Sequence, residues 1–243
     1  MDVTEKEQMI GGEALAHWYY KAKFALLLEH LRSLPLDPER FTCVDVGSGL
    51  GLFLHKLEQV GLASPARSLG VDPVYAQVTT ALNSRIEIHP SFLPGKTYDL
   101  AIMMDVLEHV PDDQKVLSDS VSRVSKNGYV FITVPALPFL YSSHDRFLGH
   151  YRRYTIASLR RLLESEGRLE ILRTHYFFAS ILPLAVPVRM RGWLNRNPTS
   201  SDMKTLPVWA GVLLERVCRW ELSWACQNRL AGLSVVALCR VCD

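Results

Sequence analysis

VDVGSGLGLF, residues 44–53, joins an apolar run to a segment of helical periodicity through a loop of three glycines. A strand that passes through such a loop into a helix is typical of nucleoside-binding α/β folds, in which backbone amides near the helix N-terminus face a ligand. The dinucleotide fingerprint needs a third glycine where this chain has Leu52, which argues against NAD. Asp45 places a carboxylate beside the loop, where it repels a diphosphate and attracts an ammonium or sulfonium group. The loop therefore predicts a small ligand that is positively charged at this end.

Apolar runs and helical segments alternate along the chain on both sides of this loop. The runs that indicate strands are residues 41–46, 66–71, 85–88, 98–104, 129–134, 169–177 and 233–240, and the helical segments lie at about 13–33, 51–61, 73–83, 112–126 and 155–166. This alternation predicts an α/β fold: a doubly wound, mostly parallel sheet of seven strands with helices on both faces. Its ligands are expected at the carboxyl ends of the strands.

The length and composition favour one domain over residues 1–243, because 243 residues with 48% hydrophobic content bury a substantial core. Residues 178–230 separate the last two strands and are too long for an ordinary loop, so a helical insertion is expected there. Pro183 and Pro187 interrupt its apolar run, which is too short to span a bilayer. The insertion either covers the active site or contacts a membrane surface through tryptophans beside arginines.

Charge and cysteine content limit the partners and the compartment. Lys+Arg 27 against Asp+Glu 25 gives a net charge of +2 without a long basic run, so no nucleic-acid partner is expected. The charged N-terminal stretch lacks the features of a signal peptide, and five cysteines fit reduced thiols, so the expected location is cytoplasmic, with peripheral membrane contact as an addition. Cys239 and Cys242 form a lone pair that is interpreted as free thiols. No pattern specifies an oligomeric state.

A second carboxylate limits the possible ligands further. Asp72 follows Gly49 by 23 residues, close to the interval at which an acid after the second strand accepts the hydroxyls of an adenosine ribose. Alternatively, Asp72 is a turn residue before Pro73. Together with Asp45, it defines a ligand with a ribose at one end and a positive charge at the other. S-adenosylmethionine fits this description.

The sequence resembles a known enzyme class in five successive motifs: VDVGSGLG, GVDP, YDLAIMMDVLEHVPDD, NGYVFITVPA and SSHDRFLGHYRRYT. They look like those of class I S-adenosylmethionine-dependent methyltransferases, in particular the broad bacterial group resembling the ubiquinone and menaquinone biosynthesis enzymes. The resemblance covers about residues 13–178 and resumes at AGLSVVALCR. It implies S-adenosyl-L-methionine as cofactor, S-adenosyl-L-homocysteine as product, and methyl transfer to an oxygen or carbon of a small, apolar or lipid-like acceptor.

The resemblance also implies roles for particular residues of the cofactor site. Asp45 would meet the amino group of the cofactor and Asp72 its ribose. The remaining implied cofactor-binding residues are Gly47, Ser48 and Gly49 at the methionine part, and Pro73, Ser91 and Phe92 beside adenine.

Candidate catalytic residues follow the fourth and fifth strands. DVLEHV puts Asp105, Glu108 and His109 where an acceptor would approach the methyl group, and His109 can act as general base at neutral pH. His150 is the second candidate base. In the alternative interpretation, Glu108 and His109 only orient the loop. The main expectation is that no metal is bound. The set Asp105, Glu108, His109 and His150 also resembles the ligands of some metal-dependent O-methyltransferases, so a divalent metal is a further hypothesis.

By the same resemblance, the segment 1–40 is an N-terminal helical lid over cofactor and acceptor, which would exclude water. The candidate acceptor-contacting residues are His17, Trp18 and Tyr20 on the lid, and His144 and Arg153 after the fifth strand. For Trp18, packing in the core is the alternative. A competing function for the whole chain is a cofactor-binding but catalytically silent regulatory or scaffold subunit that acts through the apolar insertion. A nucleotide-sugar or NAD enzyme is disfavoured by Leu52 and Asp45.

Overall fold

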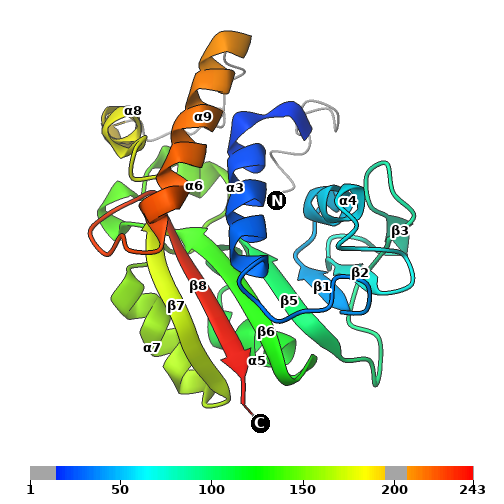
Figure 1. Cartoon of the computed structure of the whole chain (residues 1–243). Coiled ribbons are helices and arrows are strands. Elements are labelled where there is room, and N and C mark those ends of the chain that lie inside the picture. The colour runs from blue at the N-terminus through cyan, green and yellow to red at the C-terminus, as the bar shows by residue number, and fades with distance from the viewer. Residues whose placement is uncertain (1–14, 195–206, 243) are drawn as a thin grey trace.

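A computed structural model describes residues 15–194 and 207–242 of the chain (Figure 1). Its centre is an eight-stranded sheet with the order β3-β4-β2-β1-β5-β6-β8-β7. The strands are β1 (Cys43–Val46), β2 (Ser68–Val71), β3 (Thr79–Thr80), β4 (Glu87–His89), β5 (Tyr98–Met104), β6 (Val124–Pro135), β7 (Leu169–Phe177) and β8 (Ser234–Val241). The helices are α3 (Trp18–Leu31), α4 (Leu52–Gln59), α5 (Asp113–Val121), α6 (Ser143–Phe147), α7 (Ile156–Glu166), α8 (Leu182–Leu194) and α9 (Val208–Ala225), with the 3-10 turns η1 (Leu107–His109) and η2 (Pro138–Leu140).

The middle of the sheet is parallel, as predicted. β4, β2, β1, β5 and β6 run in the same direction, and β8 is antiparallel to both β6 and β7. The doubly wound α/β fold is therefore confirmed. The count of seven strands is wrong by one, because the short strand β3 adds an antiparallel eighth strand beside β4.

The predicted helix at 73–83 is also wrong. The segment holds turns and the strand β3, in which Thr79 pairs with Ile88 of β4. Val78, Thr79 and Thr80 are three consecutive β-branched residues, which favour an extended backbone over a helix. The helix predicted at 112–126 ends early at Val121, because residue 124 already begins β6.

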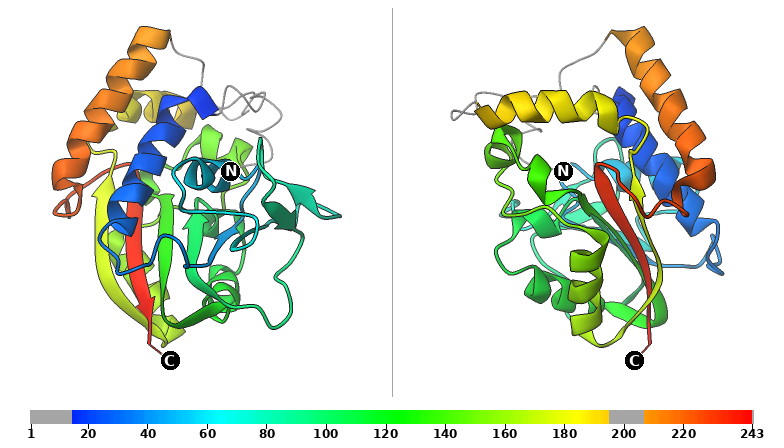
Figure 2. Two further views of the ribbon diagram at one scale, coloured as in Figure 1. Left: turned by 45° about the vertical axis from the view of Figure 1, so that its right-hand side comes forward. Right: turned by 90° about the vertical axis from the view of Figure 1, so that its left-hand side faces the viewer.

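Helices cover both faces of the sheet and build two hydrophobic clusters. Along β5, Leu100, Ile102 and Met104 enter one cluster, and Ala101 and Met103 enter the other. A strand that is apolar at every position is expected where both faces are covered. Figure 2 shows α3 and α9 packed side by side on one face and α7 on the opposite face.

The predicted lid and insertion are described only in part. Residues 1–14 and 195–206 lie outside the described residues, and α8 and α9 are the helices described within 178–230. Among the helices that the structure describes, none combines the length and apolarity that crossing a bilayer requires. All five cysteines carry free thiols.

Candidate functional site

The glycine loop leaves β1 in a backbone conformation that few residues other than glycine adopt. Gly47 has a φ of +66° and Gly51, which precedes α4, a φ of +70°. A Cβ built on Gly47 would lie 2.7 Å from a methyl carbon of Val106. Because Val106 belongs to the segment after β5, the glycine loop and that segment are in direct contact.

Gly47→Ala is expected to destabilise the protein by about 1–3 kcal/mol, since alanine is strained at positive φ and its methyl group would collide with Val106. Urea unfolding measures the change. Gly61→Ala is the matched control, because Gly61 has a φ of +77° but no described atom within 4 Å of the place that an added methyl group would take. If both variants lose the same stability, contact with Val106 does not matter.

The backbone amides of this loop donate hydrogen bonds to other groups of the protein. Gly47 and Ser48 donate hydrogen bonds to the carbonyl of Val71 at 2.7 and 3.2 Å. Gly49 donates to the Asp72 carboxylate at 2.7 Å. The expectation that the loop amides face a ligand is therefore not met for these three amides. Since a diphosphate is held by such amides, this loop is not built for one.

Asp45 is the buried carboxylate beside the loop. Its side chain is 2% exposed, and its Oδ2 has no hydrogen-bond partner among the described residues. Burial, followed by the negative charge of Asp72, raises the pKa of Asp45 to about 7. Ser48 Oγ is likewise buried without a described partner. Buried polar atoms without partners indicate a ligand, and here they fit one that carries an ammonium group.

Asp72 holds the loop from the end of β2. Besides the bond from Gly49, it accepts a hydrogen bond from the amide of Val74 at 3.0 Å. The Tyr75 hydroxyl donates to the carbonyl of Gly49 at 2.9 Å. Asp72 thus positions the glycine loop against the segment that follows β2.

The residues predicted beside adenine lie apart from one another. Pro73 is exposed next to Asp72, and Ser91 is exposed after β4. The ring of Phe92 lies 5.7 Å from the Arg123 guanidinium and packs against the cluster on the α5 and α7 face. Arg123 precedes the first residue of β6, so Phe92 lies toward the amino end of the sheet. The structure does not bring it together with the glycine loop.

A cavity of about 120 Å³ opens at the carboxyl ends of the strands, beside α3. Its lining includes all three predicted catalytic residues. The full lining is Tyr19, Tyr20, Asp105, Glu108, His109, Pro135, His144, Leu148, His150, Arg153, Arg189, Leu233 and Ser234. His17 and Trp18 are not part of it: His17 caps the N-terminus of α3, and Trp18 packs edge-on against Phe178.

Asp105 anchors α3 at this cavity. It forms an ion pair with the fully buried Lys23 and accepts hydrogen bonds from Tyr19 and Thr133, each at 3.1 Å. Burial alone would raise the pKa of Asp105, but the charge and hydrogen bond of Lys23 outweigh burial and lower it. The sequence interpretation missed Lys23, whose only signal is its place within an amphipathic helix. Asp105 is thus fully engaged with its neighbours and is poorly placed to act as a base.

His150 is oriented by a buried carboxylate. Its Nδ1 lies 3.0 Å from Asp145, which also accepts hydrogen bonds from Arg153 at 2.7 and 3.1 Å. Burial would raise the pKa of Asp145, but His150 and Arg153 hold it well below its usual range. An ionised carboxylate only accepts, so Nδ1 carries a proton, and in the neutral ring Nε2 then presents a lone pair. The charge of Arg153 is neutralised by Asp145.

The other two histidines of the cavity, His109 and His144, have different surroundings from His150. The ring of His109 meets that of His150 edge-on, with 4.5 Å between the ring centres. Burial, followed by the charge of Arg189, holds the pKa of His144 well below its usual value. His144 is therefore neutral at physiological pH.

Glu108 is buried completely, and neither of its carboxyl oxygens has a hydrogen-bond partner among the described residues. Burial, and then the negative charge of Asp105, raise its pKa well above the usual value. Candidate ligand atoms of Glu108, His109 and His150 lie within 4.8 Å of one another. Asp105 is not in this group; its carboxylate forms an ion pair with Lys23. Of the four residues in the metal hypothesis, the structure thus brings three together.

Residues 15–170 match the family model of the methyltransferase domain. The chain belongs to this family. The prediction of a class I S-adenosylmethionine-dependent methyltransferase is confirmed.

Known relatives agree over part of the chain. The ubiquinone biosynthesis O-methyltransferase of Pectobacterium carotovorum subsp. carotovorum (strain PC1) is 30% identical over 99 residues, which is 37% of this chain and 41% of that enzyme. The chain thus matches less than half the length of this relative. Ubiquinone biosynthesis O-methyltransferase of Paramagnetospirillum magneticum (strain AMB-1) is 28% identical over 116 residues, or 45% of this chain and 47% of that enzyme.

Solved structures match almost the whole fold at low identity. The putative methyltransferase bound to the Haloferax volcanii Trm112 activator has a TM-score of 0.55 and 15% identity, covering 93% of this chain and 91% of its own. The plantazolicin methyltransferase BpumL in complex with SAH has a TM-score of 0.53 and 14% identity, covering 95% and 86%. At such identities the likeness shows the fold alone.

Proposed function

We propose that this protein transfers the methyl group of S-adenosylmethionine to an oxygen or carbon of a small acceptor, with a hydroxyl oxygen as the favoured nucleophile. The observation that carries the proposal is the Asp145–His150 pair, which turns an imidazole lone pair to the cavity. A hydroxyl group needs a base as it attacks, and a neutral imidazole is suited to this at physiological pH.

The cofactor site is proposed to use three side chains. Asp45 meets the ammonium group, Ser48 Oγ is a further polar contact, and Asp72 accepts from the ribose. The cofactor supplies a methyl group on a positively charged sulfur, which an oriented nucleophile displaces. The chain contributes the position of the nucleophile, its deprotonation and the exclusion of water.

Within the cavity, His150 takes the proton of the acceptor hydroxyl at Nε2 while Asp145 stabilises the imidazolium that forms. Burial raises the pKa of Glu108 and so favours its protonated form, in which it can donate a hydrogen bond to the acceptor. Tyr19 and Tyr20 lie on α3, which Lys23 fixes over the cavity, so they limit the access of water.

The size of the cavity favours an acceptor that presents one ring or a short head group. A dry protein cavity of ~150 Å³ binds benzene, and this cavity measures about 120 Å³. Larger parts of an acceptor would extend over the surface beside it. Leu184 and Val188 of α8 and Trp209 and Trp220 of α9 are more than half exposed there.

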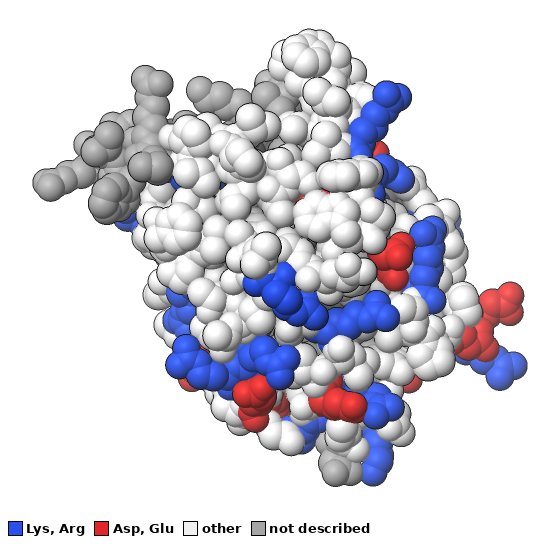
Figure 3. Space-filling view, turned by 60° about the vertical axis from the view of Figure 1, so that its left-hand side comes forward, with Lys and Arg blue, Asp and Glu red and all other residues white. Residues whose placement is uncertain are grey.

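Figure 3 shows one face of the molecule whose upper part carries few charged side chains, with Lys and Arg below it, interspersed with Asp and Glu. An apolar area beside basic residues supports a lipid-like acceptor and peripheral contact with a membrane surface from the cytoplasm.

The experiment is an acceptor screen. Purified protein is incubated with S-adenosylmethionine and a panel of phenols, catechols and long-chain alcohols, and formation of S-adenosylhomocysteine is measured. Methylation of phenolic acceptors supports the proposal. If the protein binds the cofactor, methylates none of them and co-purifies with another protein, the alternative of a regulatory or scaffold subunit holds.

A metal-assisted reaction is the second candidate, favoured by the close approach of Glu108, His109 and His150. A divalent ion held there would bind and acidify the acceptor hydroxyl. Treatment with a chelator distinguishes the two candidates, because the general-base reaction continues without a metal.

The cofactor affinity is expected to fall as the pH drops through about 7. Asp45 is protonated below its pKa, and an ammonium group needs the carboxylate. The dissociation constant therefore rises by up to about tenfold per pH unit below 7 and is constant above it. Calorimetry at pH 5.5 to 8.5 measures this, with Asp45→Asn as control. A flat profile in the wild-type protein would remove Asp45 from the ammonium site.

A further inference from the structure

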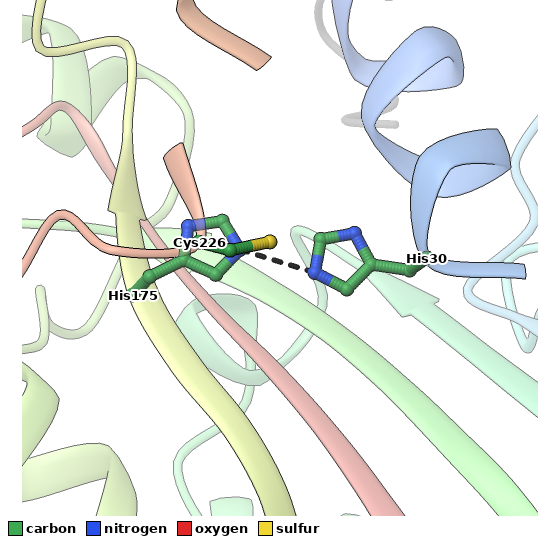
Figure 4. Close-up of side chains that lie close together, drawn as sticks. All are labelled: His30, His175 and Cys226. Carbon is green, nitrogen blue, oxygen red and sulfur yellow. Dashed lines mark hydrogen bonds between the residues drawn. The ribbon is translucent and has the colours of Figure 1, made fainter. Parts of the chain in front are cut away.

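Three candidate metal ligands from distant parts of the chain meet on the α3 side of the sheet, outside the cavity. His30 lies in the last turn of α3, His175 in β7, and Cys226 at the C-terminal end of α9 (Figure 4). One ligand atom of each lies within 4.8 Å of the other two. Both imidazoles are completely buried, and Cys226 is half-buried.

The hydrogen bonds of the two rings fix their tautomers. Nδ1 of His30 lies 2.9 Å from the carbonyl of Leu26, and Nδ1 of His175 lies 3.0 Å from the carbonyl of Tyr176. A carbonyl oxygen only accepts, so both Nδ1 atoms must carry the proton. In the neutral rings, both Nε2 atoms then present lone pairs. These two atoms face each other at 3.1 Å.

Two lone pairs at that distance repel unless a cation lies between them. The cation can be a proton, which would make one ring an imidazolium. Both rings are completely buried, so an imidazolium formed here would lie away from water. Arg173 and Arg229 add positive charge around His175.

A metal ion satisfies the same two lone pairs without protonating a ring. At Zn–N distances of 2.0–2.1 Å, two tetrahedral nitrogen ligands are separated by about 3.3 Å, close to the separation seen here. The Nδ1–H to carbonyl bonds are the outer contacts that orient metal-binding histidines. The sulfur of Cys226 adds a soft third ligand whose negative charge offsets the two arginines.

We propose that His30, His175 and Cys226 bind a Zn²⁺ ion, which connects α3, β7 and α9. The fourth position is left for water, and the partial exposure of Cys226 provides the route by which the ion enters. The site is independent of the proposed transfer reaction. It would fasten the end of α3 that lies about 10 Å from Lys23, the residue that holds the helix at the cavity.

The test uses the full-length protein after removal of metals with a chelator, titrated with Co²⁺ and then with Zn²⁺. A thiolate-to-cobalt charge-transfer band is expected in the wild-type protein and is displaced by Zn²⁺. It is lost in Cys226→Ser, and Zn²⁺ binds this variant at least about 100-fold more weakly. His30→Gln and His175→Gln are expected to lose the band as well.

Controls separate this site from others. Cys242→Ser removes an exposed thiol, and His89→Gln changes a histidine of β4, near the opposite edge of the sheet; both keep the band. Binding at Glu108, His109 and His150 involves no sulfur and gives no thiolate band. In the wild-type protein, Zn²⁺ at 100-fold excess over its dissociation constant raises the melting temperature by about 5 °C or more.

The proposal is overturned if the wild-type protein shows no thiolate band, or if Cys226→Ser keeps it. It is also overturned if Zn²⁺ raises the melting temperature of the wild-type protein and of Cys226→Ser equally. Because Cys226 lies at a helix end and is half-buried, this variant folds even if the buried histidine variants do not. A failed acceptor screen leaves these outcomes unaffected, so the two proposals are tested separately.

Discussion

His150→Gln is expected to lower kcat by about 10²–10⁴-fold, the usual contribution of a general base, and to leave cofactor affinity unchanged. Glutamine keeps a polar group of similar size but cannot accept a proton. Single-turnover methyl transfer to the best acceptor of the screen measures the rate, and calorimetry measures cofactor binding. His89→Gln, which alters a ring bonded to Glu87, is the control.

A second variant tests the orientation of His150. Asp145→Asn no longer fixes the Nδ1 proton and removes the negative charge that stabilises the imidazolium, so kcat falls and the pH profile moves to lower pH. A purely structural defect would change stability without this shift. A kcat of His150→Gln within about threefold of the wild-type value would be far above that expected after loss of a base. If His109→Gln instead lowers kcat by the expected amount, His109 is the base.

Asp45→Asn is expected to weaken cofactor binding by about 100-fold, because a hydrogen-bonded charge is removed from a buried ammonium. Calorimetry with S-adenosylhomocysteine measures the loss. Methylthioadenosine, which lacks the amino acid part, is the matched ligand, and its affinity should be the same in both proteins. An equal loss for both ligands would mean that Asp45 acts on the fold of the loop and not on the ammonium.

The stability of this variant provides the control for folding. Burial raises the pKa of Asp45 to about 7, above the value of 3.8 for an exposed aspartate, so the ionised form disfavours the folded state once the pH exceeds about 4, and the penalty grows until about 7. Asparagine removes this penalty. Asp45→Asn is therefore expected to melt no lower than the wild-type protein at pH 8.

Local sequence patterns predicted the helices and strands whose ends are marked by capping or turn residues. β5 and β7 have the predicted bounds, because each is a compact apolar or alternating run between turns. The helix predicted to start after Thr155 does so: the Thr155 side chain accepts from Ser158, and Gly167 ends the helix with a φ of +81°. Capping and turn residues act within a few positions, which is why sequence alone locates them.

Contacts between distant residues could not be predicted in this way. The Lys23–Asp105 pair joins residues 82 positions apart, and the His30–His175 contact joins residues 145 apart. Their partners depend on how α3 crosses the sheet, which periodicity does not encode. The motifs predicted His109 and His150 as candidate bases at one site, but only the structure shows the residues that contact them, such as Asp145 beside His150.

The fastening of α3 bears on how an acceptor reaches the cavity. Lys23 ties the helix to the end of β5, and His30 contacts β7 a little under two turns further on. If both contacts persist, we expect α3 to stay in place and not to open as a hinged lid. Acceptor and product would then pass lining residues outside α3, which include Leu148 and Arg189. The residues along that path, between α6 and α8, would then select among acceptors before the methyl group is transferred.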